Sequence, residues 1–167
     1  SDWEVAKPFW EASSVDTVSD CLMSGADVNA RAENTGSTPL MYASSRSKNP
    51  AVLEALLEAG ADVNARDAGG MTPLILAVSI NSMPEVVTFL LNAGANVNAR
   101  NQQGNTPLHG KPFGRNAPYF FNNTSALSML LDAGADINAT NEDGWTPLHT
   151  AAEASDNPAL VTALLDA

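Results

Sequence analysis

Two histidines are the side chains of this sequence best suited to acid–base or metal chemistry. His109 and His149 are the only histidines in the chain, and each directly follows a Thr-Pro-Leu tripeptide. The same position after the other two Thr-Pro-Leu tripeptides holds Met41 and Ile75. Because apolar residues replace histidine there, the histidines do not form a shared set of ligands.

The acidic residues and the single cysteine also lack a catalytic arrangement. Asp27, Asp62 and Asp136 recur at one position of a repeated segment, so we interpret them as loop residues. Cys21 lies at an apolar helical spacing, which favours a small core residue. The sequence has no phosphate-binding glycine loop, zinc-binding His-Glu-x-x-His helix or serine–histidine–aspartate arrangement. We therefore expect no enzyme activity, no cofactor and no metal site.

The chain of 167 residues carries a formal net charge of −11, which limits the partners it can bind. Nucleic acids and anionic membranes both attract basic surfaces, so this charge disfavours them. No apolar run has the roughly 18 residues that a membrane-spanning helix needs. We expect a soluble monomer that binds a basic or mixed-charge protein, with cytoplasmic and periplasmic or secreted locations both open.

Two markers recur along the chain in the same phase and define its organisation. One is the tripeptide Thr-Pro-Leu, and the other is the block Gly-Ala-(Asp/Asn)-(Val/Ile)-Asn-Ala, each in steps of 34, 35 or 40 residues. The tripeptide begins at Thr38, Thr72, Thr106 and Thr146, and the glycine block begins at Gly25, Gly60, Gly94 and Gly134. This shared period indicates a repeat protein.

Each repeated unit contains the start and end signals of two helices. Thr before Pro favours a helix start, because the threonine oxygen caps free backbone N–H groups and proline tolerates the first helical position. Apolar residues at spacings of three and four predict a second helix, as in residues 52–57 and 86–91. Glycine is expected to end that helix, and the polar segment after it predicts a hairpin-like loop.

This order of parts, with Thr-Pro-Leu-His at residues 106–109 and 146–149, resembles the ankyrin repeat, and the Asn-Pro turns resemble bacterial members of that family. The resemblance implies an all-α fold: an ankyrin-repeat solenoid of about five helix-turn-helix repeats with projecting hairpin-like loops. It also implies that His109 and His149 form hydrogen bonds around the Thr-Pro turn.

The resemblance covers nearly the whole chain, so we expect a single domain over residues 1–167. Its first repeat is degenerate and caps the stack, with Val15–Met23 as the second helix of that repeat. The capping repeat spans residues 1–24, and the repeats after it span about 25–59, 60–93, 94–133 and 134–167.

Ankyrin arrays bind partners through the loop tips and the inward face of the first helices, so the resemblance places candidate contacts at variable positions there. Trp145 and Met71 precede the threonine cap, where we expect exposed side chains that anchor a partner. The further candidates are Tyr42, Asn105, Gln102, Glu142 and Asp143, and the same face includes Arg31, Arg66 and Arg100.

The fourth repeat departs from the pattern after His109. Lys111-Pro112 replaces the expected Ala-Ala, and the proline is expected to shorten the first helix. The aromatic-rich insertion that follows contributes the candidate contacts Lys111, Phe113, Arg115, Tyr119 and Phe120. Two interpretations of residues 110–123 stay open: the aromatic side chains fill the space left by the shortened helix, or the segment contacts a partner.

These observations favour a non-enzymatic protein–protein interaction scaffold that binds its partner through the loop tips, the concave face and the 110–123 insertion. One alternative is an inhibitor or self-protection protein that binds and blocks an enzyme, including a secreted one. Another alternative is the targeting module of a larger enzyme.

Overall fold

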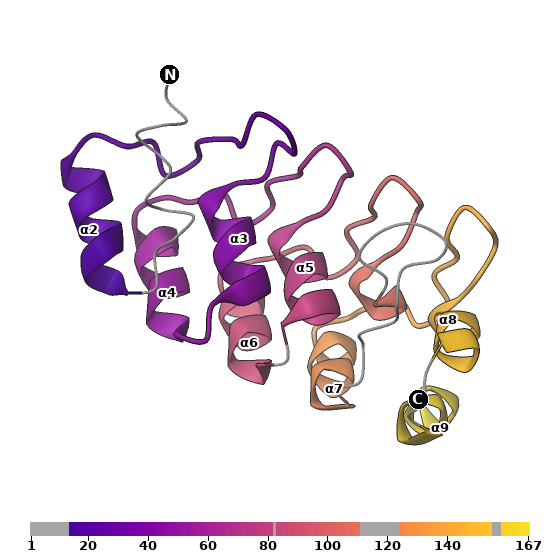
Figure 1. Ribbon diagram of the computed structural model, residues 1–167. Coiled ribbons are helices and arrows are strands. Elements are labelled where there is room, and N and C mark those ends of the chain that lie inside the picture. The colour runs from indigo at the N-terminus through magenta and orange to yellow at the C-terminus, as the bar shows by residue number, and fades with distance from the viewer. Residues whose placement is uncertain (1–13, 82, 111–123, 155–157) are drawn as a thin grey trace.

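The computed structural model describes residues 14–81, 83–110, 124–154 and 158–167, and these residues form helices joined by loops, with no strand among them (Figure 1). The helices are α2 (Val15–Met23), α3 (Pro39–Arg46), α4 (Pro50–Glu58), α5 (Pro73–Ile80), α6 (Pro84–Asn92), the 3₁₀ helix η1 (Pro107–His109), α7 (Thr124–Asp132), α8 (Pro147–Ala154) and α9 (Pro158–Asp166). The predicted all-α fold is confirmed, and α2 has the bounds predicted for the second helix of the first repeat.

Thr-Pro pairs begin helices α3, α5, η1 and α8, the first helices of the four repeats after the capping repeat, as predicted. In α3 the backbone N–H of Met41 donates to Oγ1 of Thr38 over 3.4 Å, and in α5 the N–H of Ile75 donates to Oγ1 of Thr72 over 3.3 Å. Proline occupies the first position of both helices, where its missing N–H removes no helical bond. The repeated Thr-Pro-Leu tripeptide therefore favours a helix start through contacts between residues that are close in the chain.

Glycine follows the second helix of the first four repeats, also as predicted: Gly25, Gly60, Gly94 and Gly134 come after α2, α4, α6 and α7. Gly60 has a φ of +88°, which a side chain would disfavour, and its N–H donates to the Leu57 carbonyl over 3.0 Å. The chain reverses at this point and enters the projecting loop. Helices α2, α4, α6 and α7 therefore end by the same left-handed turn.

The helices form two rows along the stack (Figure 1). One row contains α3, α5, η1 and α8, and the other contains α2, α4, α6, α7 and α9. Successive helices in a row come from neighbouring repeats, so each repeat buries its apolar face against the next. The leucines buried between the rows are Leu40, Leu53, Leu56, Leu74, Leu90, Leu108, Leu127, Leu130 and Leu160.

The fourth repeat has a shortened first helix, as predicted. Its described part is the three-residue helix η1, whereas α3, α5 and α8 have eight residues each. The helix ends at Gly110, which has a φ of +61° and donates its N–H to the Pro107 carbonyl. The shortening was predicted from Lys111 and Pro112, and these two residues lie outside the described residues.

Helix α5 contains a buried hydroxyl that offers a test of the packing. Among the described residues, Ser79 Oγ is the buried side-chain oxygen with no hydrogen-bond partner, whereas Ser44 Oγ donates to the Leu40 carbonyl over 2.7 Å. We expect Ser79→Ala to raise the free energy of unfolding by about 1 kcal/mol, because an unpaired hydroxyl is costly to bury. Urea denaturation measures the change. Ser44→Ala is the control, and a larger gain for Ser44→Ala would contradict the assignment.

Candidate protein-binding surface

The loops between repeats are held by hydrogen bonds at their base. In the loop before α5, Oδ1 of Asp67 accepts the N–H of Gly69 over 2.8 Å and the N–H of Met71 over 2.9 Å. Asn101 and Asn141 make equivalent bonds in the next two loops. Either a carboxylate or an amide oxygen therefore fixes this turn. The residue at this position can be charged or neutral without loss of the turn.

The loop tips, defined here as residues 33–35, 68–69, 102–103 and 142–143, are linked to one another. The N–H of Ala68 donates to the Thr35 carbonyl over 2.9 Å, and the N–H of Gln102 donates to the Gly69 carbonyl over 2.9 Å. The N–H of Glu142 donates to the Gln103 carbonyl over 3.0 Å. These bonds join the loops that project from one edge of the stack into a continuous ridge (Figure 1).

A row of asparagines also links the loops at their base. Asn64 Nδ2 donates to the Gly94 carbonyl over 3.1 Å, and its Oδ1 accepts the Asn96 N–H over 2.8 Å. Asn29 and Asn98 make the same pair of bonds to the repeats that follow them. This bridging role was not predicted, although the asparagine recurs in every glycine block of the sequence.

Removing one of these asparagine bridges should weaken the stack. We expect Asn64→Ala to lower the free energy of unfolding by about 2 kcal/mol, because two hydrogen bonds between repeats are lost. Asn138 has the same place in the last repeat, and its side chain makes no hydrogen bond within the described part of the chain. Asn138→Ala is therefore the matched control, with an expected change below about 0.5 kcal/mol. Equal losses in urea denaturation would show that the bridges add no stability.

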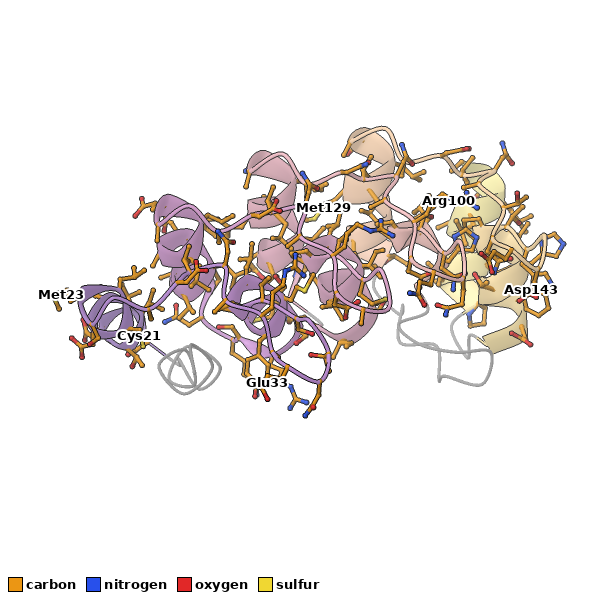
Figure 2. All side chains as sticks on the ribbon, turned by 90° about the horizontal axis from the view of Figure 1, so that it is seen from above. Cys21, Met23, Glu33, Arg100, Met129 and Asp143 are labelled. Carbon is orange, nitrogen blue, oxygen red and sulfur yellow. The ribbon has the colours of Figure 1, made fainter. Side chains whose placement is uncertain are left out.

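Four of the candidate contact residues lie on the surface, as expected. Tyr42 is exposed on α3, and the Arg46 guanidinium carbon lies 5.4 Å from the centre of its ring. Gln102, Glu142 and Asp143 are exposed at the loop tips, although Gln102 Nε2 also donates to the Ala68 carbonyl over 2.6 Å. Seen from above, Glu33 and Asp143 lie on one side of the stack and Met129 of α7 lies on the other (Figure 2).

The exposed positions expected for Met71 and Asn105 are wrong. Met71 is 0% exposed and Asn105 is 5% exposed. The loop of the next repeat covers each of them, with Asn101 Nδ2 3.6 Å from the Met71 sulfur and Asn141 Nδ2 2.9 Å from Asn105 Oδ1. Neither side chain is therefore available to a partner, and both hold neighbouring loops together.

Trp145 has the same register in the last loop but is only half-buried. Within the described residues no further loop follows to cover it. Its backbone carbonyl lies 2.9 Å from His109 Nε2, which ties this loop to the fourth repeat. Trp145 thus retains an exposed portion.

The histidines have the structural role that the resemblance implied. His109 is fully buried, and its Nδ1 accepts the backbone N–H of Thr106 over 3.1 Å. His149 Nδ1 accepts the N–H of Thr146 over 3.3 Å at an exposed position. Both rings therefore close a Thr-Pro turn.

Cys21 is a core residue, consistent with its apolar spacing. The thiol is 5% exposed and lies in the core cluster with Val18. Burial, with the Asp20 carboxylate as a second cause, raises the pKa of the Cys21 thiol. Both effects disfavour the nucleophilic thiolate.

The remaining candidate contacts, Lys111, Phe113, Arg115, Tyr119 and Phe120, lie outside the described residues. In the part that is described, no group of three or more histidine, cysteine or acidic side chains is placed to hold a metal ion. The same part contains no helix long and apolar enough to span a membrane.

Two rows of stacked helices and a ridge of linked loops define a helical-repeat solenoid. Family models described as ankyrin repeats (3 copies) match residues 9–67 and 47–110, and a model described as ankyrin repeats (many copies) matches residues 116–165. The chain belongs to the ankyrin repeat family. Its repeats are protein–protein interaction modules, and the family is generally non-enzymatic.

Proposed function

We propose that this protein is a non-catalytic recognition module that binds a protein partner through the loop tips and the exposed face of the first helices. The linked tips support the proposal, because three backbone hydrogen bonds hold four loops in one ridge. A ridge fixed before binding loses little conformational entropy when a partner docks. Trp145, which is half-buried at one end, adds an aromatic contact.

The charge of the ridge favours a partner of mixed charge. Glu33 lies at the first tip, and Glu142 and Asp143 lie at the last, whereas the middle tips carry Ala68 and Gln102. The backbone bonds between tips do not depend on these side chains, so the side chains vary without loss of the framework. A partner with basic groups opposite the two ends would match this pattern.

The test is affinity capture with the intact protein, followed by affinity measurements on the captured partner. We expect Glu142→Lys combined with Asp143→Lys to weaken binding about ten-fold or more, because like charges then face the basic groups of the partner. Trp145→Ala is expected to weaken it about ten-fold.

Glu85→Lys is the matched control, because Glu85 is an exposed acid on α6 and not on a loop tip. A loss with Glu85→Lys as large as with the tip variants would contradict the proposed surface. The captured partner and the full coding sequence separate the narrower hypotheses. Recovery of an enzyme that the protein inhibits would favour the inhibitor, and a catalytic domain in the same coding sequence would favour the targeting module.

A further inference from the structure

Three loops carry an arginine at the same register. Arg31, Arg66 and Arg100 each follow the alanine that ends the glycine block. Arg31 Nη1 donates to the Arg66 carbonyl over 2.7 Å, and Arg100 Nη2 donates to the Thr140 carbonyl over 2.6 Å. The first and third arginines thus bridge to the backbone of the following repeat.

Arg66 does not make this bridge. Within the described part of the chain, its guanidinium has no hydrogen bond and no ion pair. Its exposed side chain lines an open pocket of about 620 Å³ between two neighbouring loops. An arginine with all its donors unused therefore lies at the wall of a pocket.

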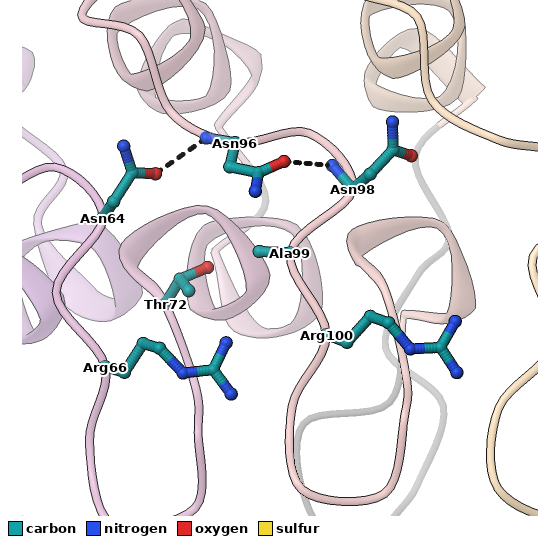
Figure 3. A pocket seen from close by; sticks show the side chains of 7 residues that line it. All are labelled: Asn64, Arg66, Thr72, Asn96, Asn98, Ala99 and Arg100. Atoms are coloured by element: carbon teal, nitrogen blue, oxygen red, sulfur yellow. Dashed lines mark hydrogen bonds between the residues drawn. The ribbon is translucent and has the colours of Figure 1, made fainter.

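The rest of the pocket is polar, and the stem of Arg100 forms part of its wall. Figure 3 shows Arg66 and Arg100 extending in the same direction from adjacent loops, with the asparagines on the opposite side of the pocket. The lining residues are Asn64, Arg66, Thr72, Asn96, Asn98, Ala99 and Arg100. The Arg100 guanidinium itself extends out of this pocket toward the next repeat, where Nη2 donates to the Thr140 carbonyl over 2.6 Å.

No acidic side chain lines this pocket, in contrast to the acidic chain as a whole. Asp27, Asp62 and Asp136 accept the N–H two residues ahead over 2.9 Å, and Asn96 makes the same bond without a charge. The sequence has no aspartate or glutamate between residues 86 and 131. The positive charge of the pocket is therefore not neutralised by its own lining.

We propose that this pocket binds the carboxylate of a glutamate or aspartate in an acidic segment of the partner protein. The planar guanidinium of Arg66 matches a carboxylate by two parallel N–H···O bonds. This inference rests on the proposed function and names the chemistry of the partner at one point of its surface. The net charge of −11 opposes a polyanion at a distance, but charges beyond about 8 Å are largely screened at physiological salt.

The test uses the intact protein, labelled with nitrogen-15, and a synthetic peptide of alternating alanine and glutamate. We expect the peptide to shift the Nε–H resonance of Arg66 saturably, and the same peptide with glutamine in place of glutamate to leave it unchanged. Arg66→Gln should weaken binding of the glutamate peptide about ten-fold or more, since a charge-assisted bidentate contact is lost. Arg31→Gln is the matched control at the same register, with less than about two-fold loss, because that guanidinium is already bonded to protein carbonyls.

Three results would overturn the inference: an unmoved Arg66 resonance, an equal shift with the glutamine peptide, or an equal shift with inorganic phosphate alone. The melting temperature of Arg66→Gln should stay unchanged, since this side chain makes no hydrogen bond in the described structure. A negative result for the carboxylate pocket is distinct from a negative result for the proposed function. If the captured partner loses affinity with the loop-tip variants but not with Arg66→Gln, only the carboxylate pocket is wrong.

Discussion

His109→Ala is expected to lower the free energy of unfolding by about 3 kcal/mol, because it leaves several buried polar groups without partners. The ring is fully buried, and Nδ1 accepts the Thr106 N–H over 3.1 Å. Nδ1 therefore carries no proton, and Nε2 donates to the Trp145 carbonyl over 2.9 Å. The substitution removes the closure of a turn and a bridge between repeats together.

His149→Ala is the matched control for this prediction. His149 makes the same contact with the Thr146 N–H, but it is exposed, so water can replace the lost bond. We expect a loss of about 1 kcal/mol or less. Urea denaturation followed by circular dichroism measures both variants, and equal losses would contradict the bridge between His109 and Trp145.

Gly104→Ala is expected to lower the free energy of unfolding by about 3 kcal/mol, as the sum of backbone strain and a steric clash. Gly104 has a φ of +74°, which an alanine adopts with strain. A Cβ atom there would lie 2.9 Å from the backbone nitrogen of Glu142, in the next loop, and 2.9 Å from Arg100 Nη2. The arginine can move, but the backbone of the neighbouring loop cannot without breaking the link between tips.

Gly144 separates these two costs, because it has the same register in the last loop. Its φ is +76°, and a Cβ atom there would meet no atom of the described residues within 4 Å. Gly144→Ala should therefore cost only the backbone strain, about 1 kcal/mol. Thermal denaturation of both variants gives the difference. If the two variants melt at the same temperature, the close packing of adjacent loops is absent in solution.

These variants also bear on the proposed function, which requires that the loop tips remain linked as one surface. The Gln103 carbonyl accepts the Glu142 N–H, the same nitrogen that the alanine at residue 104 would approach. We expect Gly104→Ala to weaken partner binding together with stability. Gly144→Ala should leave binding close to that of the unmodified protein.

Most of the helical framework could be predicted from the sequence. The Thr-Pro starts, the glycine ends and the short first helix of the fourth repeat depend on residues adjacent in the chain, such as Thr72 with Pro73. Capping bonds span only three residues, so a sequence pattern contains both partners. The contacts predicted for Lys111, Phe113, Arg115, Tyr119 and Phe120 stay predictions.

The sequence by itself determined the period, the helix pairs and the register of the loops, because local hydrogen bonds and backbone preferences decide them. Only the tertiary structure decided which residue of each register is available to a partner. Met71 and Trp145 have equivalent places, yet the loop of the next repeat buries the first and leaves the second half-exposed. Likewise Arg31 and Arg66 share a register, but only the Arg31 guanidinium donates to a backbone carbonyl of the following repeat. Exposure and pairing depend on a neighbour some 34 residues away, whose position is set by the stacking of the repeats.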